Sequence, residues 1–120
     1  MKNVTLVIGA STNPNRYSNI AIKRLRGKEL PTVALGLRKG KVLDVLINDE
    51  KLHYNTIDTV TLYLNPKRQE EYYNYIINLQ PRRVIFNPGT ENMEFVELLT
   101  AHKIASEIAC TLVLLSTNQY

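Results

Sequence analysis

Residues 5–18 read TLVIGASTNPNRYS, and this stretch decides the fold that the sequence predicts. The apolar run at 4–8 is rich in β-branched residues, as a buried strand is, and it stops at Gly9. A loop of small and polar residues follows, and a helical pattern begins near Ser18. Open α/β folds bind phosphate with a strand, a glycine-containing loop and a helix in this order, because the loop amides and the helix N-terminus supply N–H donors.

The rest of the chain alternates predicted strands with predicted helices. After the strand at 4–8, the predicted strands are 32–37, 44–47, 59–64, 83–86 and 107–110. The predicted helices are 18–26, 66–79, 93–102 and 112–115. This alternation indicates a parallel sheet with right-handed crossovers. We therefore expect an α/β, Rossmann-like three-layer fold with a mostly parallel sheet of five to six strands and the first strand in its centre.

Several helix ends carry their own signals. Asn65 is a predicted N-cap with Pro66 at the first helical position, and the helix is expected to end before Gln80-Pro81. Asn92 is the predicted N-cap of the next helix. The spacing of that helix predicts three inward-facing side chains, which are Phe95, Leu98 and Leu99.

The composition predicts one globular domain, residues 1–120, with 44% hydrophobic residues. No apolar run approaches the ~18 residues that span a membrane, and no signal-peptide pattern precedes the first strand. The single cysteine, Cys110, excludes an intramolecular disulfide and a cysteine-based metal cluster. We expect a cytoplasmic protein with no metal and no membrane partner. Its tyrosines at 72, 73 and 75 lack an interleaved basic stripe, so no nucleic-acid partner is expected either.

The first loop carries a set of groups suited to phosphate. Gly9 allows a close backbone approach, the Ser11 hydroxyl can donate a hydrogen bond, and the Arg16 guanidinium matches phosphate geometry. Tyr17 could stack or hydrogen-bond, and Ser18 is the predicted cap of the following helix. The loop is not a dinucleotide fingerprint, because Ser11 stands where the second glycine of G-x-G-x-x-G would be.

The end of the second predicted strand discriminates between nucleotides. An NAD-binding domain places an Asp or Glu there, where it accepts hydrogen bonds from the ribose hydroxyls. This chain has Gly36-Leu37-Arg38-Lys39-Gly40-Lys41 instead, with three cations and no carboxylate. The pattern argues against NAD and favours a phosphate on the ribose. That leaves the 2′-phosphate of NADP and the 3′-phosphate of coenzyme A (CoA) as alternatives, with Arg38 as the candidate contact.

The dipeptide Asn-Pro occurs three times, as Asn13-Pro14, Asn65-Pro66 and Asn87-Pro88, each just past the end of a predicted strand. In a parallel sheet those ends share one edge, which is where open α/β folds bind ligands. Each Asn-Pro can also be a helix cap and nothing more. Gly89 follows the third and permits a sharp turn against a ligand.

Residues for catalysis are few. His53 and His102 have no motif around them, and neither Ser-His-Asp nor H-E-x-x-H spacing occurs. Cys110 ends an apolar segment, which is typical of a buried structural thiol. We therefore predict no catalytic residue.

The sequence resembles the small stand-alone CoA-binding domain proteins, which are similar to the N-terminal domain of the succinyl-CoA synthetase α subunit. The resemblance covers essentially the whole chain. The matching segments are Gly9-Ala10-Ser11, Asn13-Pro14, Arg16-Tyr17-Ser18, TVTLYLNP at 59–66, RVIFNPGTEN at 83–92 and ACTL at 109–112.

The resemblance implies a Rossmann-like fold with CoA across the carboxyl edge of the sheet. The first loop (Gly9, Ala10, Ser11, Asn13, Pro14, Arg16, Tyr17, Ser18) would meet the phosphates. Gly36 and Arg38 would lie at the adenosine end, and Asn65-Pro66 with Asn87-Pro88-Gly89 would face the pantetheine arm. Two segments depart from the family pattern. Family members often have an Asn-Pro-type segment where this chain has residues 36–38, and residues 41–54 also differ from the family sequence. The ligase's phosphorylated histidine belongs to a separate domain with no counterpart in this chain.

These observations predict a module that binds CoA or an acyl-CoA and has no catalysis of its own. The alternatives are an NADP-dependent reductase, an acyl-transfer protein that uses Cys110, and a regulatory module that acts on an unidentified protein partner. A homodimer is also compatible with a small α/β domain.

Overall fold

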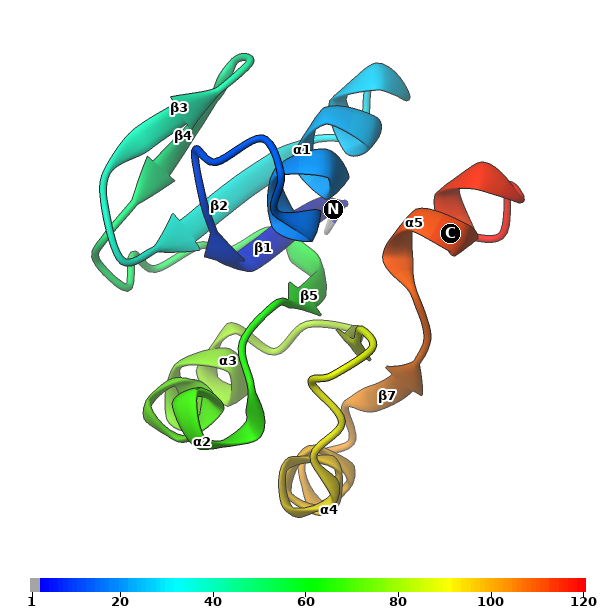
Figure 1. The fold of residues 1–120 in the computed structure, drawn as a ribbon. Coiled ribbons are helices and arrows are strands. Elements are labelled where there is room, and N and C mark those ends of the chain that lie inside the picture. The colour runs from blue at the N-terminus through cyan, green and yellow to red at the C-terminus, as the bar shows by residue number, and fades with distance from the viewer. Residues whose placement is uncertain (1–2) are drawn as a thin grey trace.

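The computed structural model describes residues 3–120, and it alternates strands and helices as the sequence predicts (Figure 1). The strands are β1 (Val4–Ala10), β2 (Thr32–Gly36), β3 (Gly40–Val42), β4 (Val45–Asn48), β5 (Ile57–Leu62), β6 (Arg83–Phe86) and β7 (Ala105–Ile108). The helices are α1 (Tyr17–Gly27), α2 (Pro66–Gln69), the 3₁₀ turn η1 (Glu70–Tyr72), α3 (Tyr73–Leu79), α4 (Met93–Ala101) and α5 (Thr111–Ser116).

The seven strands form one sheet in the order β3-β4-β2-β1-β5-β6-β7, with β1 in the centre. All neighbouring pairs are parallel except β3 with β4. On one side of β1 the chain passes through β2 to the edge strand β3 and turns back into β4, which lies between β3 and β2. It then crosses to start β5 on the other side of β1. This confirms the Rossmann-like α/β fold and the central first strand, while the sheet has one strand more than expected.

The additional strand is β3, which forms a hairpin with β4 at the sheet edge. Its turn is Leu43-Asp44, without the glycine that usually marks a two-residue hairpin, and Leu43 takes a φ of 53°. The missing turn signal is why the sequence predicts a single short strand at 44–47. No helix lies between β2 and β4, since the hairpin makes that connection instead.

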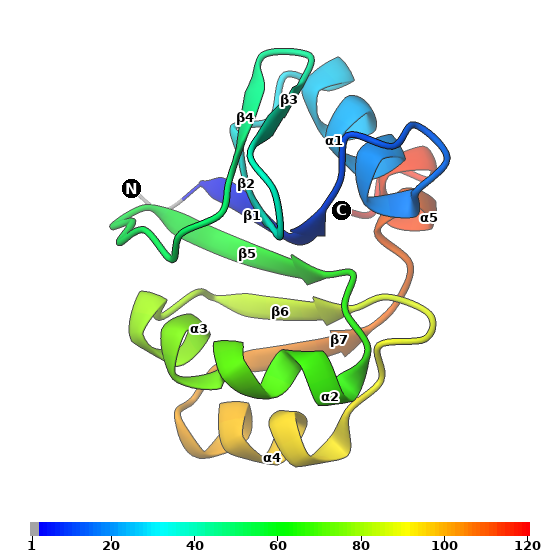
Figure 2. The same cartoon turned by 60° about the vertical axis from the view of Figure 1, so that its left-hand side comes forward.

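Helices cover both faces of the sheet (Figures 1 and 2). On one face of the sheet, α2, α3 and α4 pack against β5, β6 and β7. Leu62, Phe86 and Phe95 are fully buried between these helices and the strands. On the other face, α1 and α5 lie together, and Ile22 and Leu25 of α1 pack on Val7. Both faces of the sheet are apolar, so helices must cover each of them, and this arrangement gives the three layers.

Three local predictions are corrected. The predicted helix at 66–79 is interrupted by η1, because a 3₁₀ turn aligns residues three apart and so brings Gln69 and Tyr72 to the interior together. Leu98 is 37% exposed, since α4 buries only the stripe containing Phe95 and Leu99. The last strand ends at Ile108, two residues before Cys110.

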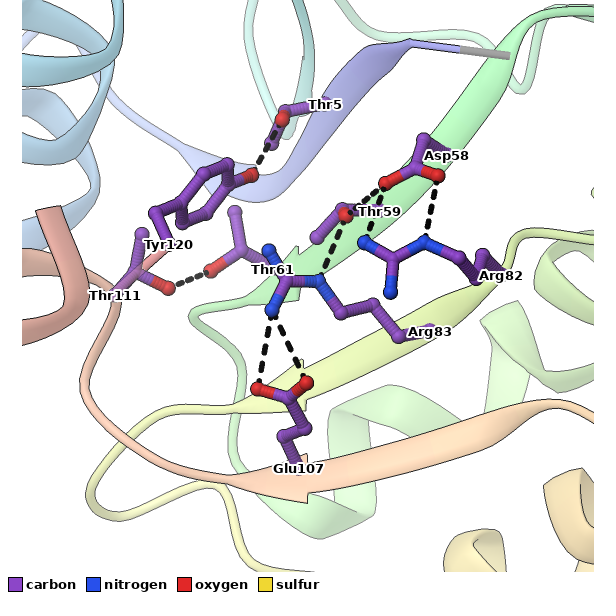
Figure 3. Close-up of polar contacts among 9 residues, drawn as sticks. All are labelled: Thr5, Asp58, Thr59, Thr61, Arg82, Arg83, Glu107, Thr111 and Tyr120. Carbon is purple, nitrogen blue, oxygen red and sulfur yellow. Dashed lines mark hydrogen bonds and ion pairs between the residues drawn. The ribbon is translucent and has the colours of Figure 1, made fainter. Parts of the chain in front are cut away.

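A partly buried polar cluster connects Thr5 to Tyr120 (Figure 3). The Arg83 guanidinium donates to Thr59 Oγ1 at 3.0 Å and to both Glu107 carboxylate oxygens at 3.1 Å. The ring of Tyr120 covers that guanidinium at 4.6 Å, and the Tyr120 hydroxyl bonds Thr5 of β1. The cluster therefore joins β1, β5, β6 and β7 to the C-terminal segment, on the sheet face that α5 covers.

None of the helices within residues 3–120 is both long and apolar enough to cross a membrane. In the same part of the chain, no three His, Cys, Asp or Glu side chains come together in a group that could hold a metal ion.

Candidate functional site

A cleft of about 650 Å³ lies at the carboxyl ends of β1, β2, β5 and β6. Its position is set by topology, because the strand order reverses between β1 and β5 and the loops that leave them diverge. The lining comes from the loops after these four strands and from the start of the helices that follow. The lining residues are Gly9–Asn13, Arg16–Ser18, Gly36–Arg38, Tyr63–Asn65, Arg68, Tyr72 and Pro88–Thr90.

Two glycines let the floor of the cleft form. Gly9 has a φ of 92°, and a Cβ there would lie 2.8 Å from the Tyr63 carbonyl oxygen. A Cβ on Gly36 would lie 2.3 Å from the Ala10 carbonyl oxygen. Both contacts are with backbone, which cannot move aside as a flexible side chain can. The ends of β1, β2 and β5 approach one another closely only because neither position carries a side chain.

The loop after β1 is ordered by its own hydrogen bonds. The Ser11 hydroxyl accepts from the Asn13 N–H at 3.1 Å, and Asn13 Oδ1 accepts from the Asn15 N–H at 2.9 Å. Asn19 of α1 donates its Nδ2 to the Ser11 carbonyl at 2.9 Å, so the loop is tied to the helix. The Ser11 hydroxyl proton stays available for an acceptor in the cleft.

The N-terminus of α1 opens toward the cleft. The N-cap residue is Arg16, and no side chain accepts a hydrogen bond from the first turn. The prediction that Ser18 caps this helix is wrong, because the helix begins one residue earlier, at Tyr17. Ser18 lies inside the first turn and lines the cleft. The Asn19 N–H donates to the Arg16 carbonyl at 3.0 Å, whereas the N–H groups of Tyr17 and Ser18 have no acceptor within residues 3–120. These two N–H groups and the positive end of the helix dipole are therefore available to an anion.

The charged side chains that line the cleft all have one sign. The lining contains Arg16, Arg38 and Arg68 and no Asp or Glu. None of these three guanidiniums forms an ion pair or a side-chain hydrogen bond within residues 3–120, whereas Arg26, Arg82 and Arg83 each bond a carboxylate. Unpaired arginines that converge on a cleft without carboxylates suit a ligand with several phosphates.

A second hollow of about 420 Å³ adjoins the cleft and shares Gly36, Leu37 and Tyr72 with it. Its charged side chains are Asp49, Glu50, Lys51 and Glu71, so it is mainly acidic. This hollow is therefore less suited to an anionic ligand than the first cleft is.

Two loops form the wall of the cleft on the β5 and β6 side. Asn65 caps α2, and its Oδ1 accepts from the Arg68 N–H at 2.9 Å, as the sequence predicts. Gly89 takes a φ of 89° with open space around its Cβ position, and its N–H donates to Glu91 at 2.8 Å. The positive φ turns the loop after β6 back toward the cleft.

Tyr63 lies under this wall with its hydroxyl buried and without a hydrogen-bond partner within residues 3–120. Burial raises the pKa of Tyr63 to about 12, while the nearby Thr61 and Thr111 hydroxyls, which bond each other at 2.8 Å, act in the opposite direction. The phenol is therefore uncharged at physiological pH.

The cleft brings together most of the residues that the sequence predicts for the site. Twelve predicted residues line it, which are Gly9, Ala10, Ser11, Asn13, Arg16, Tyr17, Ser18, Gly36, Arg38, Asn65, Pro88 and Gly89. Pro14, in a turn, and Pro66, the first residue of α2, are exposed and lie outside the lining. Asn87 is 2% exposed and also lies outside it.

Asn87 is buried because all its side-chain atoms bond within the protein. Its Nδ2 donates to Thr61 Oγ1 at 2.7 Å and to the Leu62 carbonyl at 2.9 Å. Its Oδ1 accepts from the Thr111 N–H at 2.8 Å. The side chain thus links β5, β6 and the start of α5, and it supports the cleft from below.

The lining also contains residues that the sequence analysis does not identify, which are Thr12, Leu37, Tyr63, Leu64, Arg68, Tyr72 and Thr90. Arg68 had a readable signal, because it falls in the first turn of the helix predicted at 66–79, where a cation opposes the helix dipole and therefore suggests another role. The apolar members carry no such signal, since their patterns are those of core residues.

The candidate groups for acid–base or thiol chemistry lie elsewhere. Cys110 is half-buried at the N-cap of α5 and does not line the cleft, and neither does His53 or His102. The only ionisable side chains in the lining are arginines and tyrosines.

Comparisons with known proteins agree with this geometry. Residues 3–116 match the family model described as a CoA binding domain. A search of curated proteins finds no match. A crystal structure described as an uncharacterized protein is 44% identical, with a TM-score of 0.95, and the match covers 100% of this chain and 99% of that one.

Two further solved structures extend the comparison. A hypothetical protein from Pyrococcus horikoshii OT3 is 26% identical with a TM-score of 0.79, over 93% of this chain and 80% of that one. A structure from Thermus thermophilus shares the fold at 16% identity and a TM-score of 0.86, over 99% of this chain and 91% of that one.

The family match spans nearly all of the chain, including every loop that lines the cleft. The cleft itself lies where parallel α/β sheets bind nucleotides and has the charge that a phosphate-bearing ligand requires. By its sequence and its fold, this chain belongs to the family of CoA-binding domains.

Proposed function

We propose that the cleft binds CoA or an acyl-CoA. The observation that carries the proposal is the set of three unpaired arginines, Arg16, Arg38 and Arg68, around a cleft without a carboxylate. CoA carries a pyrophosphate and a 3′-phosphate, so its recognition needs several separate cationic or N–H donor groups. A cleft of about 650 Å³ is within the size range of small-molecule sites.

The residues fit the parts of CoA in a defined order. The N–H groups of Tyr17 and Ser18 at the start of α1, the Ser11 hydroxyl and the Arg16 guanidinium are the donors for the pyrophosphate. Arg38, at the end of β2, is the cation for the 3′-phosphate. The loops after β5 and β6 offer Asn65 and Thr90 beside Tyr63 and Leu64, a mixture that suits the amides and methylenes of the pantetheine arm.

The cleft supports binding without catalysis. A general acid–base mechanism needs an ionisable group whose pKa lies near neutrality, and a nucleophilic one needs an activated thiol, hydroxyl or amine. The lining has no carboxylate, imidazole or thiol, and its Tyr63 phenol has its pKa raised to about 12. We therefore infer a binding module whose ligand is held and not transformed.

Calorimetry with CoA, dephospho-CoA and NADPH tests the proposal. We expect CoA to bind at least about tenfold more tightly than dephospho-CoA, because a charge-assisted contact to the 3′-phosphate contributes about 1.5–3 kcal/mol. Arg38→Met should remove most of that difference while it leaves dephospho-CoA binding almost unchanged.

Arg24→Met is the matched control, since Arg24 is also exposed and forms no ion pair within the described residues, but it lies in the last turn of α1 away from the cleft. This variant should keep the discrimination. Equal affinity for CoA and dephospho-CoA would show that Arg38 does not meet the 3′-phosphate. Tighter binding of NADPH than of CoA would overturn the ligand class.

A further inference from the structure

Gln69 is a buried carboxamide that lies behind the cleft and does not touch its surface. Its side chain has no exposure, and it belongs to the last residue of α2, immediately before the η1 turn. A fully buried amide is costly unless each of its donors and acceptors has a partner. The partners of Gln69 therefore show what it does.

Both N–H groups of Gln69 bond to backbone of the cleft wall. Nε2 donates to the Leu64 carbonyl at 2.8 Å and to the Thr90 carbonyl at 2.8 Å. Leu64 belongs to the loop after β5, Thr90 belongs to the loop after β6, and both residues line the cleft. One planar amide thus fixes the separation of the two loops.

The remaining atom of the amide is also fixed. Gln69 Oε1 accepts from Asn92 Nδ2 at 3.0 Å, and Asn92 Nδ2 also donates to the Tyr73 hydroxyl at 2.8 Å. Asn92 Oδ1 caps α4 through the Phe95 N–H at 3.2 Å. The reverse orientation of the Gln69 amide would place its oxygen against two carbonyl oxygens, so these bonds determine a single orientation.

We propose that Gln69 is a positioning residue for the ligand: it sets the spacing of the loops after β5 and β6 and thereby the part of the cleft that receives the pantetheine arm. The inference rests on the proposed function for the ligand's identity. A planar amide is required because only a carboxamide offers two donors in one plane to two carbonyls and an acceptor to a third group.

Gln69→Glu keeps the shape and removes both donors. At neutral pH the introduced carboxylate faces two carbonyl oxygens, so the two loops are pushed apart. Burial and these carbonyls raise the pKa of the introduced group, and its protonated form can donate to one of the carbonyls again. Gln69→Met removes the donors without adding a titratable group. Asn74→Asp adds the same charge at an exposed position of α3.

The experiment compares two ligands across pH by calorimetry. CoA reaches the whole cleft, whereas adenosine 3′,5′-bisphosphate lacks the pantetheine arm. At pH 7.5, Gln69→Glu should weaken CoA binding by about tenfold or more and bisphosphate binding by less than about twofold, since two buried hydrogen bonds are lost on the pantetheine side only. Asn74→Asp should match the wild type for both ligands.

The pH series separates positioning from a general loss of structure. The ratio of variant to wild-type Kd for CoA should fall several-fold from pH 7.5 to pH 5.5 in Gln69→Glu and stay constant in Gln69→Met. If Gln69→Glu does not fold, Gln69→Met carries the comparison of the two ligands.

Equal weakening of both ligands, or unchanged CoA affinity in both variants, would overturn the positioning role while the wild-type affinity still supports the proposed function. Failure of the wild type to bind CoA would overturn the proposed function, and this inference with it.

Discussion

Gly36 shows how a single residue determines whether the cleft exists. The end of β2 passes so close to β1 that a Cβ on Gly36 would lie 2.3 Å from the Ala10 carbonyl oxygen. The resemblance to CoA-binding domains places Gly36 with Arg38 at the adenosine end of the ligand, and the structure gives Gly36 a different role. Gly36 is needed for the approach of two strands, and it positions Arg38 by allowing β2 to reach that point.

We expect Gly36→Ala to lower the free energy of unfolding by about 2 kcal/mol or more, because backbone must shift to relieve the overlap. Gly27 at the end of α1 has nothing within 4 Å of its Cβ position. Gly27→Ala should therefore be neutral or stabilising by up to about 1 kcal/mol. Urea unfolding of both variants measures the difference in their free energies of unfolding. Equal changes in the two variants would show that the close approach at Gly36 does not make an added Cβ destabilising.

At the scale of elements, the β3–β4 hairpin takes the place of a crossover helix. It pairs with β2 through β4, and it lies near the first loop, since a Cβ on Gly40 would meet the Thr12 side chain at 2.4 Å. The hairpin thus supports the loop after β1 from the side. Its turn is locally unfavourable, because Leu43 is an exposed leucine at a φ of 53°.

Leu43→Gly should stabilise the protein by about 0.5 kcal/mol, since glycine adopts positive φ without strain but loses more entropy on folding. Leu46 is equally exposed but lies in regular β4, so Leu46→Gly should destabilise by about 0.5–1 kcal/mol. Thermal unfolding should show a higher melting temperature for Leu43→Gly and a lower one for Leu46→Gly than for the wild type. A loss of stability in both variants would mean that the Leu43 side chain contributes packing that outweighs its backbone strain.

At the scale of the whole molecule, the segment ending at Tyr120 returns to β1 over the cluster of Arg83, Thr59 and Glu107 (Figure 3). Beside this cluster, Arg82 makes a two-point contact with Asp58, at 2.9 and 3.1 Å. The guanidinium of Arg82, with a smaller effect from the Thr59 hydroxyl, lowers the pKa of Asp58 against the opposing effect of burial.

Because of this pKa shift, the free energy of unfolding depends on pH in the acidic range. A carboxylate with a lowered pKa stabilises the fold above its ordinary pKa of about 3.9, and the contribution is lost as the pH falls through the lowered value. Because the pair is partly exposed, it contributes about 1 kcal/mol at most. Between pH 6 and pH 3, urea unfolding should show a smaller loss of stability in Asp58→Asn than in the wild type.

Asp49→Asn removes an exposed carboxylate that forms no ion pair within residues 3–120, and it should follow the wild-type pH dependence. If Asp58→Asn loses as much stability between pH 6 and pH 3 as the wild type does, the Asp58–Arg82 pair is not the source of that loss.

The sequence by itself determined the order of strands and helices, the central β1 and the loops at one edge of the sheet. It could do so because these depend on local patterns: apolar runs, Asn and Pro at helix starts, and glycine at the end of β1. It also predicted twelve residues of the cleft lining, since those loops follow strand ends that a parallel sheet must bring together.

Only the tertiary structure decided which polar side chains face the cleft and which support it. Asn87 and Gln69 are both amides near the ends of neighbouring elements, and nothing local distinguishes them from ligand contacts. Their burial and their bonds to Thr61, Leu64 and Thr90 come from segments far apart in the chain. The β3–β4 hairpin and the position of Arg68 in the cleft lining likewise depend on packing between elements, which no local pattern encodes.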